Sequence, residues 1–408
     1  MEVFHRRCAG LDVHKDTVVA CIRLARGNGA DHVVRTFETT TNALLQLADW
    51  LTKNDCTHVA MESTGIYWKP VWHILESSFE LVLANATEIR NVPGRKTDVN
   101  DATWIADLLA HGLIRASFVP DTPIQELRDL TRTRKQLARE ITQHTLRIQK
   151  TLEDVNLKIT GLISDVVGVS GRAILEAIIA GESDPEKLLK VTNGRLKAAP
   201  ERLLEALHGR IRDHHRFLLK LHLGQIDALH AAVRDVEARL GTALEPFQAD
   251  IERLKTIPGV SLIVAWVILA EIGFDMSRFP TSAHLVSWAG LCPRSDESAG
   301  KRRSTRIRKG APWLKTVLVQ AAWAASRKKD SYFRAQFFRL RSRRGPMKAI
   351  VAVAASILTS AYYILSRRQP YRDLGSNHFD RLDSDKRAQR LVKRLTDLGF
   401  QVDIRPAA

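Results

Sequence analysis

The sequence predicts an α/β domain followed by mainly helical regions, and three observations support this fold class. β-rich runs alternate with helical patterns in the first third of the chain, apolar residues at helical spacing form a seam through the middle third, and the last third is helical and strongly basic. At 408 residues the chain is also too long for one domain of ordinary size. We therefore expect three domains, spanning residues 1–120, 121–253 and 254–408.

The composition excludes several classes of protein. With 45% hydrophobic and 26% charged residues, the chain is neither disordered nor collagen-like. Its four cysteines, at positions 8, 21, 56 and 292, include no C-x-x-C pair, which is typical of a reducing cytosol. The first residues lack the apolar run of a secretory signal. We expect a cytoplasmic protein.

The longest uncharged apolar stretch runs from Ala349 to Leu365 and contains Ser356, Thr359 and Ser360. Its 17 residues fall short of the roughly 20 that cross a bilayer. The stretch therefore predicts a buried helix, and we expect no membrane partner.

The order of elements in the first domain is informative. Two β-rich runs between residues 8 and 24 flank the polar turn HKDT, and a third run at 32–40 completes an antiparallel meander. The pattern then predicts a helix at 44–51, a strand at 58–64, a helix at 68–75, a strand at 80–86 and a helix from about 98. Three antiparallel strands leading into alternating strands and helices is the order found in ribonuclease H and RuvC-like nuclease folds.

The middle domain carries two runs of apolar residues with heptad-like spacing. The first run occupies positions 127, 130, 137, 141, 148, 152 and 155. The second occupies positions 203, 207, 211, 218, 221, 229, 232, 236, 240 and 244. The Gly- and Pro-containing stretch 161–200 between the two runs is able to turn the chain back. Two long helices follow from this pattern. They pair either within the chain, as an ordinary bundle, or between chains, as a dimerising coiled coil.

The net charge of +17 is concentrated in one block. Residues 1–120 carry 12 basic and 14 acidic side chains and residues 121–257 carry 22 and 20, whereas residues 294–348 carry 17 and 3. Aromatic residues interrupt this block at helical spacing, which favours a folded basic surface over a solvated tail. Such a surface is typical of proteins that bind nucleic-acid phosphates.

Four carboxylates are placed so that one metal-dependent site would explain them. Asp12 ends the first strand, in GLDVHKD, and Glu62 ends a central strand, in AMESTG. Groups at adjacent strand ends converge on one edge of an α/β sheet. Asp98 and Asp101 are three residues apart, so on a helix they share a face. Several carboxylates hold the paired Mg²⁺ or Mn²⁺ ions of phosphoryl-transfer enzymes, which lie about 3.5–4 Å apart.

Taken singly, each of these acids has a simpler interpretation as a helix cap or a surface charge. Asp98 is placed well for a helix N-cap, and Asp16 and Asp107 compete with the four as metal ligands.

A second constellation lies in the basic block. Ser298 precedes Ala299 and Gly300, whose small size lets a phosphate backbone approach. The cations that follow are Lys301, Arg302, Arg303, Arg306, Arg308 and Lys309. A serine attacks phosphorus when a base removes its proton and cations stabilise the phosphoryl oxygens, but the segment supplies no evident base. Ser295 and Ser304 are rival nucleophiles, and a loop that only contacts phosphates is the simpler interpretation.

The turn Pro258–Gly259–Val260 between two helical segments resembles a helix-hairpin-helix, whose amides meet phosphates. A turn made only for helix packing explains it equally well.

These motifs together resemble the insertion sequence 110 family of DEDD transposases, over residues 8–400. The resemblance rests on GLDVHKD, AMESTGIYWKP, PGRKTDVNDATWIADLLAHGL, IPGV, FPTSAHLVSWAGLCP, ESAGKRRSTRIRKGAPWLK and SRRGPMKAIVAVAASIL. It implies a RuvC-like domain in which Asp12, Glu62, Asp98 and Asp101 bind Mg²⁺ or Mn²⁺. It also implies that Ser298, in ESAGK, forms a covalent phosphoserine link to DNA.

The resemblance implies partners as well. Members of the family work as homo-oligomers, here a dimer or tetramer in which the acidic site acts with a serine of the neighbouring subunit. A guide (bridge) RNA from the element pairs with donor and target DNA, so that base pairing reads the sequence and the protein reads backbones. One departure is Lys315, where many relatives are expected to have arginine.

We therefore expect a transposase or recombinase that cuts and rejoins DNA. Two alternatives stay open: a metal-dependent nuclease or junction resolvase without a covalent intermediate, and a non-catalytic nucleic-acid-binding protein.

Overall fold

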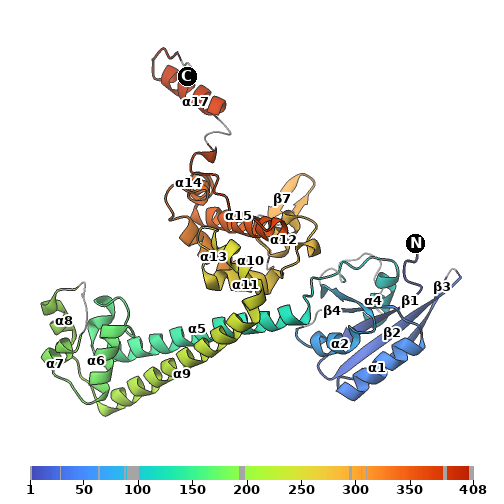
Figure 1. The fold of residues 1–408 in the computed structure, drawn as a ribbon, viewed down its shortest axis with the longest axis horizontal. Coiled ribbons are helices and arrows are strands. Elements are labelled where there is room, and N and C mark those ends of the chain that lie inside the picture. The colour runs from blue at the N-terminus through green and yellow to red at the C-terminus, as the bar shows by residue number, and fades with distance from the viewer. Residues whose placement is uncertain are drawn as a thin grey trace. The chain divides into compact units, whose positions relative to one another are not determined.

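The computed structural model describes most of the chain. The described residues are 2–27, 29–62, 65–86, 89, 101–192, 198–293, 296–304, 306–308, 310–379 and 384–403, with the side chains of 296–298, 302–303 and 384–387 left out. Contacts divide the chain into two compact units, Met1–Val119 and Pro120–Ala408, which are described in turn (Figure 1). The division of the second unit into two domains at 253/254 stays a prediction.

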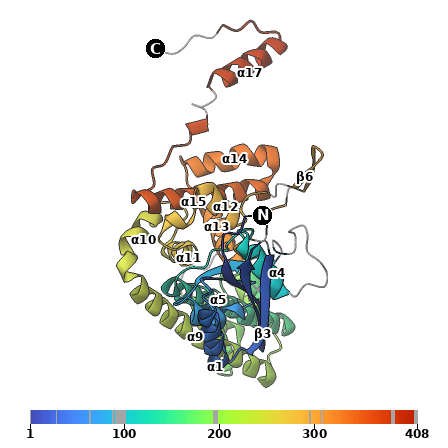
Figure 2. The same ribbon diagram turned by 90° about the vertical axis from the view of Figure 1, so that its right-hand side faces the viewer.

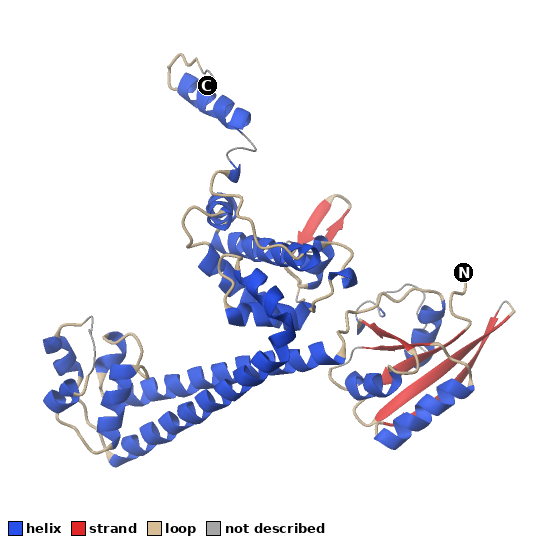
Figure 3. Ribbon diagram, in the orientation of Figure 1, coloured by secondary structure: helices blue, strands red, loops and turns tan. Residues whose placement is uncertain are grey.

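A five-stranded mixed sheet forms the centre of the first unit (Figure 3). Its strands are β1 (Arg7–Val13), β2 (Thr17–Arg26), β3 (Gly29–Glu38), β4 (His58–Glu62) and β5 (Glu80–Ala84). Their order in the sheet is β3-β2-β1-β4-β5. The first three pair antiparallel, as the predicted meander requires, and β4 and β5 continue the sheet parallel to β1. The α/β class of this part of the chain is confirmed.

Helices cover both faces of the sheet. On one face, α1 (Thr41–Lys53) and α2 (Trp68–Leu75) share a core with the alternate strand residues Ala9, Leu11 and Met61. On the other face lies α4 (Asp101–Ala110) (Figure 2). It packs against residues such as Cys8 and Ala60.

The contact between α4 and β1 is unusually close because residue 10 is a glycine. A Cβ atom built on Gly10 would lie 2.2 Å from the main-chain oxygen of Ala102 and 2.4 Å from the nitrogen of Ala106. Beside it, the Cys8 thiol donates to the oxygen of Ala106 at 3.6 Å, and its burial raises its pKa to about 12. The helix backbone therefore rests directly on the strand.

We predict that Gly10→Ala lifts α4 from the sheet and lowers the free energy of unfolding of this unit by about 1–3 kcal/mol, the usual cost of overpacking. Displacing the helix exposes Cys8 and lowers its raised pKa, so alkylation of this thiol near pH 8 becomes faster. Thermal unfolding and mass-spectrometric alkylation rates measure the two effects.

Gly29→Ala is the control, because at this exposed glycine the nearest described atom outside the chain neighbours is the oxygen of Arg26, 3.8 Å from a built Cβ atom. Equal stability of the Gly10→Ala and Gly29→Ala proteins would contradict the packing argument.

The second unit begins with a hairpin of two long helices. α5 (Thr122–Asp154) and α9 (Asp213–Leu244) pair antiparallel within the chain, as the contacts Arg134–Glu237 and His144–His222 indicate (Figure 1). At the far end the chain turns back through a 3-10 helix and three short helices, which share one core with the hairpin. These are η1 (Lys158–Gly161), α6 (Val169–Ile179), α7 (Pro185–Lys190) and α8 (Pro200–Ala206).

The predicted apolar seam of α9 is partly wrong in phase. Leu221 belongs to the expected run but is 45% exposed, whereas Leu219, Leu223 and Ile226 are buried against the first helix and the tip. The expected positions 203 and 207 lie outside this helix, at α8. Leucines are so frequent in this segment that several helical phases fit the sequence. Packing against the tip core, formed by η1, α6, α7 and α8 at the far end of the hairpin, selects one of them.

The C-terminal part of this unit is helical. Its elements are η2 (Glu245–Phe247), α10 (Gln248–Lys255), α11 (Leu262–Ile272), η3 (Met276–Arg278), α12 (Ser282–Trp288), β6 (Asp296–Ser298), β7 (Lys301–Ser304), α13 (Pro312–Ala325), α14 (Tyr332–Arg344), α15 (Pro346–Arg367) and α17 (Ser384–Asp397). α15 contains the predicted apolar helix and packs against α12, α13 and α14. It is the one described helix long and apolar enough to cross a membrane, but half of its apolar window is buried in the protein.

Packing accounts for the Pro258–Gly259–Val260 turn. Gly259 has a φ of +83°, and a Cβ atom there would lie 2.2 Å from the main-chain oxygen of Ala321 in α13. Only glycine meets both constraints. A phosphate contact by the amides of this turn stays a prediction.

A buried ionic cluster joins α5 to α11. Glu271, 1% exposed, accepts two hydrogen bonds from Arg132, at 2.9 and 3.0 Å. Arg128 donates to the main-chain oxygens of Ala270 and Glu271 at the end of α11. Burial of Arg128 lowers its pKa to about 10. Because an unpaired buried charge is costly, this cluster fixes which faces of the two helices meet.

Candidate active site and nucleic-acid interface

Asp12 and Glu62 are neighbours at the carboxyl ends of parallel strands. Leu11 pairs with Met61 across β1 and β4, so the next residue on each strand is one of the two acids. Adjacent strands lie about 4.8 Å apart. Both acids are on the α4 side of the sheet, because they alternate with Gly10 and Ala60, which contact that helix or its core. The predicted convergence of these two acids is therefore present in the backbone.

Asp101 lies near the same edge of the sheet, on the face that α4 covers. It is the first residue of α4, and this helix runs antiparallel to β1: Ala106 lies over Cys8, and Ala102 lies over Gly10. The helix start is thus next to the strand end that carries Asp12. Three of the four predicted acids come from elements that meet at one edge.

The surroundings of the two strand acids differ. Glu62 is 9% exposed. The Asp12 side chain is 22% exposed and lies 3.2 Å from Nε2 of His14, whose side chain is 58% exposed. His14 was not predicted, although its position two residues after Asp12 is the signal that would have found it. A histidine in this place can hold a proton or orient the carboxylate.

The fourth predicted acid, Asp98, lies outside the described residues, so its proposed roles as ligand or N-cap are untested. Among the residues that are described, no three His, Cys, Asp or Glu side chains are close enough to hold one metal ion. The donor chemistry nevertheless fits a hard divalent cation, since carboxylate oxygens are the ligands that Mg²⁺ and Mn²⁺ prefer.

The competing acids have other contacts. Asp107 accepts a hydrogen bond from Arg23 at 2.8 Å and lies 2.9 Å from His32, so it ties α4 to β2 and β3. Asp16 is exposed in the turn before β2.

Ser298 ends the first strand of a two-stranded hairpin that projects from the C-terminal helices (Figure 1, Figure 2). It pairs with Lys301, and the turn between them is Ala299–Gly300. Both turn residues have positive φ, +50° and +72°, which matches the two-residue turn of tight hairpins. The small residues thus build the turn, and the serine side chain is not among those described.

The predicted cations follow on this hairpin and its return loop. Lys301, Arg306 and Arg308 are exposed, as a phosphate-binding role requires. Arg302 and Arg303 lie in β7 without described side chains, and Lys309 is outside the described residues.

Lys315, the departure from the expected arginine, has a local role. Its Nζ donates to the main-chain oxygen of Arg308 at 2.9 Å, and burial lowers its pKa. This hydrogen bond anchors the loop after the hairpin to α13.

Comparisons with known proteins agree with this arrangement. A transposase family model, that of the DEDD transposases of IS110, matches residues 9–157, and a model described as transposase IS116/IS110/IS902 family matches residues 251–337. Together they cover more than half of the chain. The chain belongs to the IS110 family of transposases.

Individual relatives match parts of this family member. Over 149 residues it is 32% identical to the transposase for insertion sequence element IS1111A of Coxiella burnetii, covering 35% of this chain and 39% of that protein. Over 122 residues it is 30% identical to the pilin gene-inverting protein of Moraxella bovis, covering 29% and 37%. The chain thus spans less than two fifths of the length of these curated relatives.

Proposed function

We propose that this protein is a DNA transposase or recombinase that cuts and rejoins DNA strands through a RuvC-like acidic site. The observation that carries the proposal is the placement of Asp12 and Glu62 on paired strand ends with the start of α4, at Asp101, beside them. The mixed sheet, with strand order β3-β2-β1-β4-β5, supports the proposal of a RuvC-like domain. The transposase and gene-inverting relatives support a DNA-rearranging activity.

The acids of this site have distinct tasks in the proposal. Asp12, Glu62, Asp98 and Asp101 would hold the divalent ions, which when bound neutralise charge on a transferring phosphate. Glu62, nearly buried, has little freedom to move, whereas the Asp12 side chain is more exposed. His14, at 3.2 Å, orients the Asp12 carboxylate.

Ser298 is the proposed nucleophile. Its oxygen would bond to phosphorus while the bond from phosphorus to the DNA sugar oxygen breaks, leaving a covalent protein–DNA link. In support, the serine directly precedes the tight turn of the hairpin, and exposed cations follow it, Lys301 and the return-loop arginines, which would stabilise phosphoryl oxygens. We propose that the acidic site and this serine act together in a homo-oligomer, dimer or tetramer, in the cytoplasm.

A guide RNA completes the proposal. The basic block of residues 294–348 far exceeds what one serine needs, and its charges suit backbones of both RNA and DNA.

Substitution of the strand acids tests the metal-dependent site. Asp12→Asn and Glu62→Gln should each lower recombination by at least about 100-fold, a loss usual for groups that act in the transition state. A two-plasmid assay carrying the DNA that flanks the gene, and hence the element ends, measures this. Asp16→Asn removes the same charge from an exposed turn and should change little. Undiminished recombination by both site variants would favour a non-catalytic nucleic-acid-binding protein.

Trapping the adduct tests the nucleophile. Wild-type protein denatured during the reaction should carry covalently attached DNA, and Ser298→Ala should carry none. Ser295→Ala and Ser304→Ala are controls that keep the adduct. A fully active Ser298→Ala protein would instead support a metal-dependent nuclease or junction resolvase.

RNA guidance predicts that one RNA species, transcribed from the DNA beside the gene, copurifies with the protein. Sequencing of the bound RNA measures this. Recombination by an RNA-free preparation would argue against guidance.

A further inference from the structure

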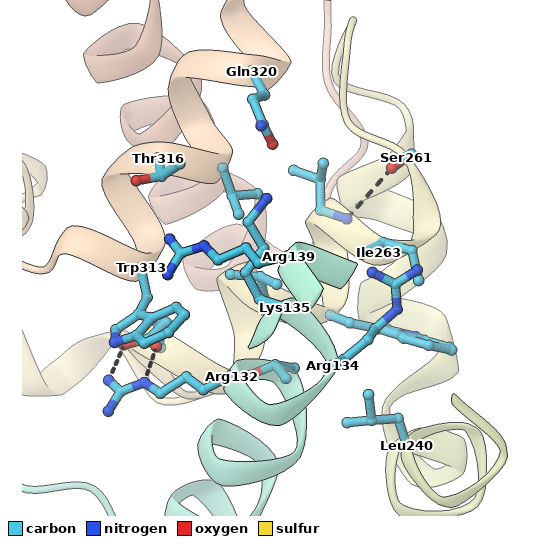
Figure 4. Close-up of a pocket in the computed structure, with 16 residues that line it drawn as sticks. Arg132, Arg134, Lys135, Arg139, Leu240, Ser261, Ile263, Trp313, Thr316 and Gln320 are labelled. Atoms are coloured by element: carbon cyan, nitrogen blue, oxygen red, sulfur yellow. Dashed lines mark hydrogen bonds and ion pairs between the residues drawn. The ribbon is translucent and has the colours of Figure 1, made fainter. Parts of the chain in front are cut away.

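A cavity of about 300 Å³ lies within the second unit, where α5 meets α9, α11 and α13 (Figure 4). None of the described site residues predicted from the sequence lines it. Cations of α5 line it together with Ser261, Glu271, Trp313, Thr316 and Gln320.

Four cations of α5 face this cavity, and two of them are neutralised. Arg132 is held by the buried carboxylate of Glu271. Arg134 donates to Glu237 of α9 at 2.7 Å. These two pairs tie the helices together, so their charges are already used.

The other two cations have no acidic partner among the described residues. Lys135 is half-buried, and Arg139 stacks over Trp313, with 5.2 Å between its guanidinium carbon and the ring centroid. Arg132 contacts the same ring at 5.8 Å. The tryptophan therefore limits the freedom of the Arg139 fork without neutralising it. Two like charges kept together in a concave site repel each other, and packing alone does not require them.

Neutral hydrogen-bonding groups complete the lining. Gln320 points from α13 toward the two cations (Figure 4). The Thr316 hydroxyl donates to Pro312 and keeps its lone pairs, while Ser261 caps α11 by accepting from the amide of Val264 at 3.4 Å. The first turn of this 11-residue helix borders the cavity, so the positive end of its dipole adds to the cations.

We propose that this cavity binds a backbone phosphate of a single DNA strand, held by Lys135 and Arg139. An arginine fork and a lysine beside a helix N-terminus are typical phosphate ligands. The volume is at the lower end of the range for ligand pockets, so it takes a phosphate with part of its sugar and excludes a duplex. The inference rests on the proposed function only in taking DNA as the substrate.

The position of the site also suits a substrate contact. Lys135 and Arg139 belong to the segment 9–157, and α11 and α13 belong to 251–337, the two segments matched by the transposase models. A strand held here would touch both.

The test is equilibrium binding of a short single-stranded oligodeoxynucleotide to the full chain, in EDTA, over a salt series. Lys135→Gln/Arg139→Gln should weaken binding about tenfold or more, because two charge-assisted hydrogen bonds are lost. The slope of log affinity against log salt should become shallower by about 1. Lys150→Gln/Lys190→Gln, which removes the same charge from exposed sites in the same unit, is the matched control and should lose less.

Gln320→Glu provides a second variant of the same size at an exposed helix position. It adds a carboxylate facing the cations, and it should weaken DNA binding while thermal stability is kept. Equal losses in the pocket and control pairs, or no loss in either, would overturn the proposal. So would binding of inorganic phosphate that depends on Lys135 and Arg139 while DNA affinity does not. The binding assay contains EDTA and measures affinity without recombination. A negative result in it therefore does not bear on the acid-site and serine experiments.

Discussion

The contact between the α4 backbone and Gly10 determines the geometry of the acidic site. Asp12 and Glu62 are brought together by strand pairing alone, but Asp101 reaches their edge only because its helix rests directly on β1. Asp107, hydrogen-bonded to Arg23 and next to His32, fixes the same helix on its other side. An acid that competed with the quartet in the sequence thus has a positioning role, and it holds the helix that presents a member of that quartet.

The second unit depends on a comparable constraint. Here a buried charge fixes a helix contact, whereas in the first unit the absence of a side chain at Gly10 does so. Glu271 pairs with Arg132 in the interior where α5 meets α11, and Arg128 binds the end of α11. Removing one partner of such a cluster leaves the other charge buried and unpaired. The cluster therefore specifies how the helices meet more than it adds stability. That specified contact sets which α5 cations face the cavity. Both units therefore position chemistry by a local constraint on one helix.

Much of the first unit was predictable from the sequence, because strand period and strand ends are local signals. Asp12 and Glu62 were identified from that pattern, and the register bears out their adjacency. The α9 seam was mispredicted because the choice among leucine phases depends on the tip core, which is built from residues 157–207. His14 was not predicted, because its one signal is the position two residues after Asp12 and not a periodic pattern. Asp98 and the Ser298 side chain stay predictions.

The phosphate cavity shows why segment charge is a poor guide to where phosphates bind. Residues 121–257 are almost neutral in sum, so the sequence predicts phosphate binding by the basic block of 294–348 instead. What matters for binding, however, is which charges lie close together in the fold. Two acids of this segment lie at the far end of the hairpin, where Asp227 pairs with Arg172 and Asp154 lies beside His215. At the near end, Glu237 offsets Arg134, and Glu271, from outside the segment, offsets Arg132. Lys135 and Arg139 are left as a local positive surplus that no sum over sequence reveals.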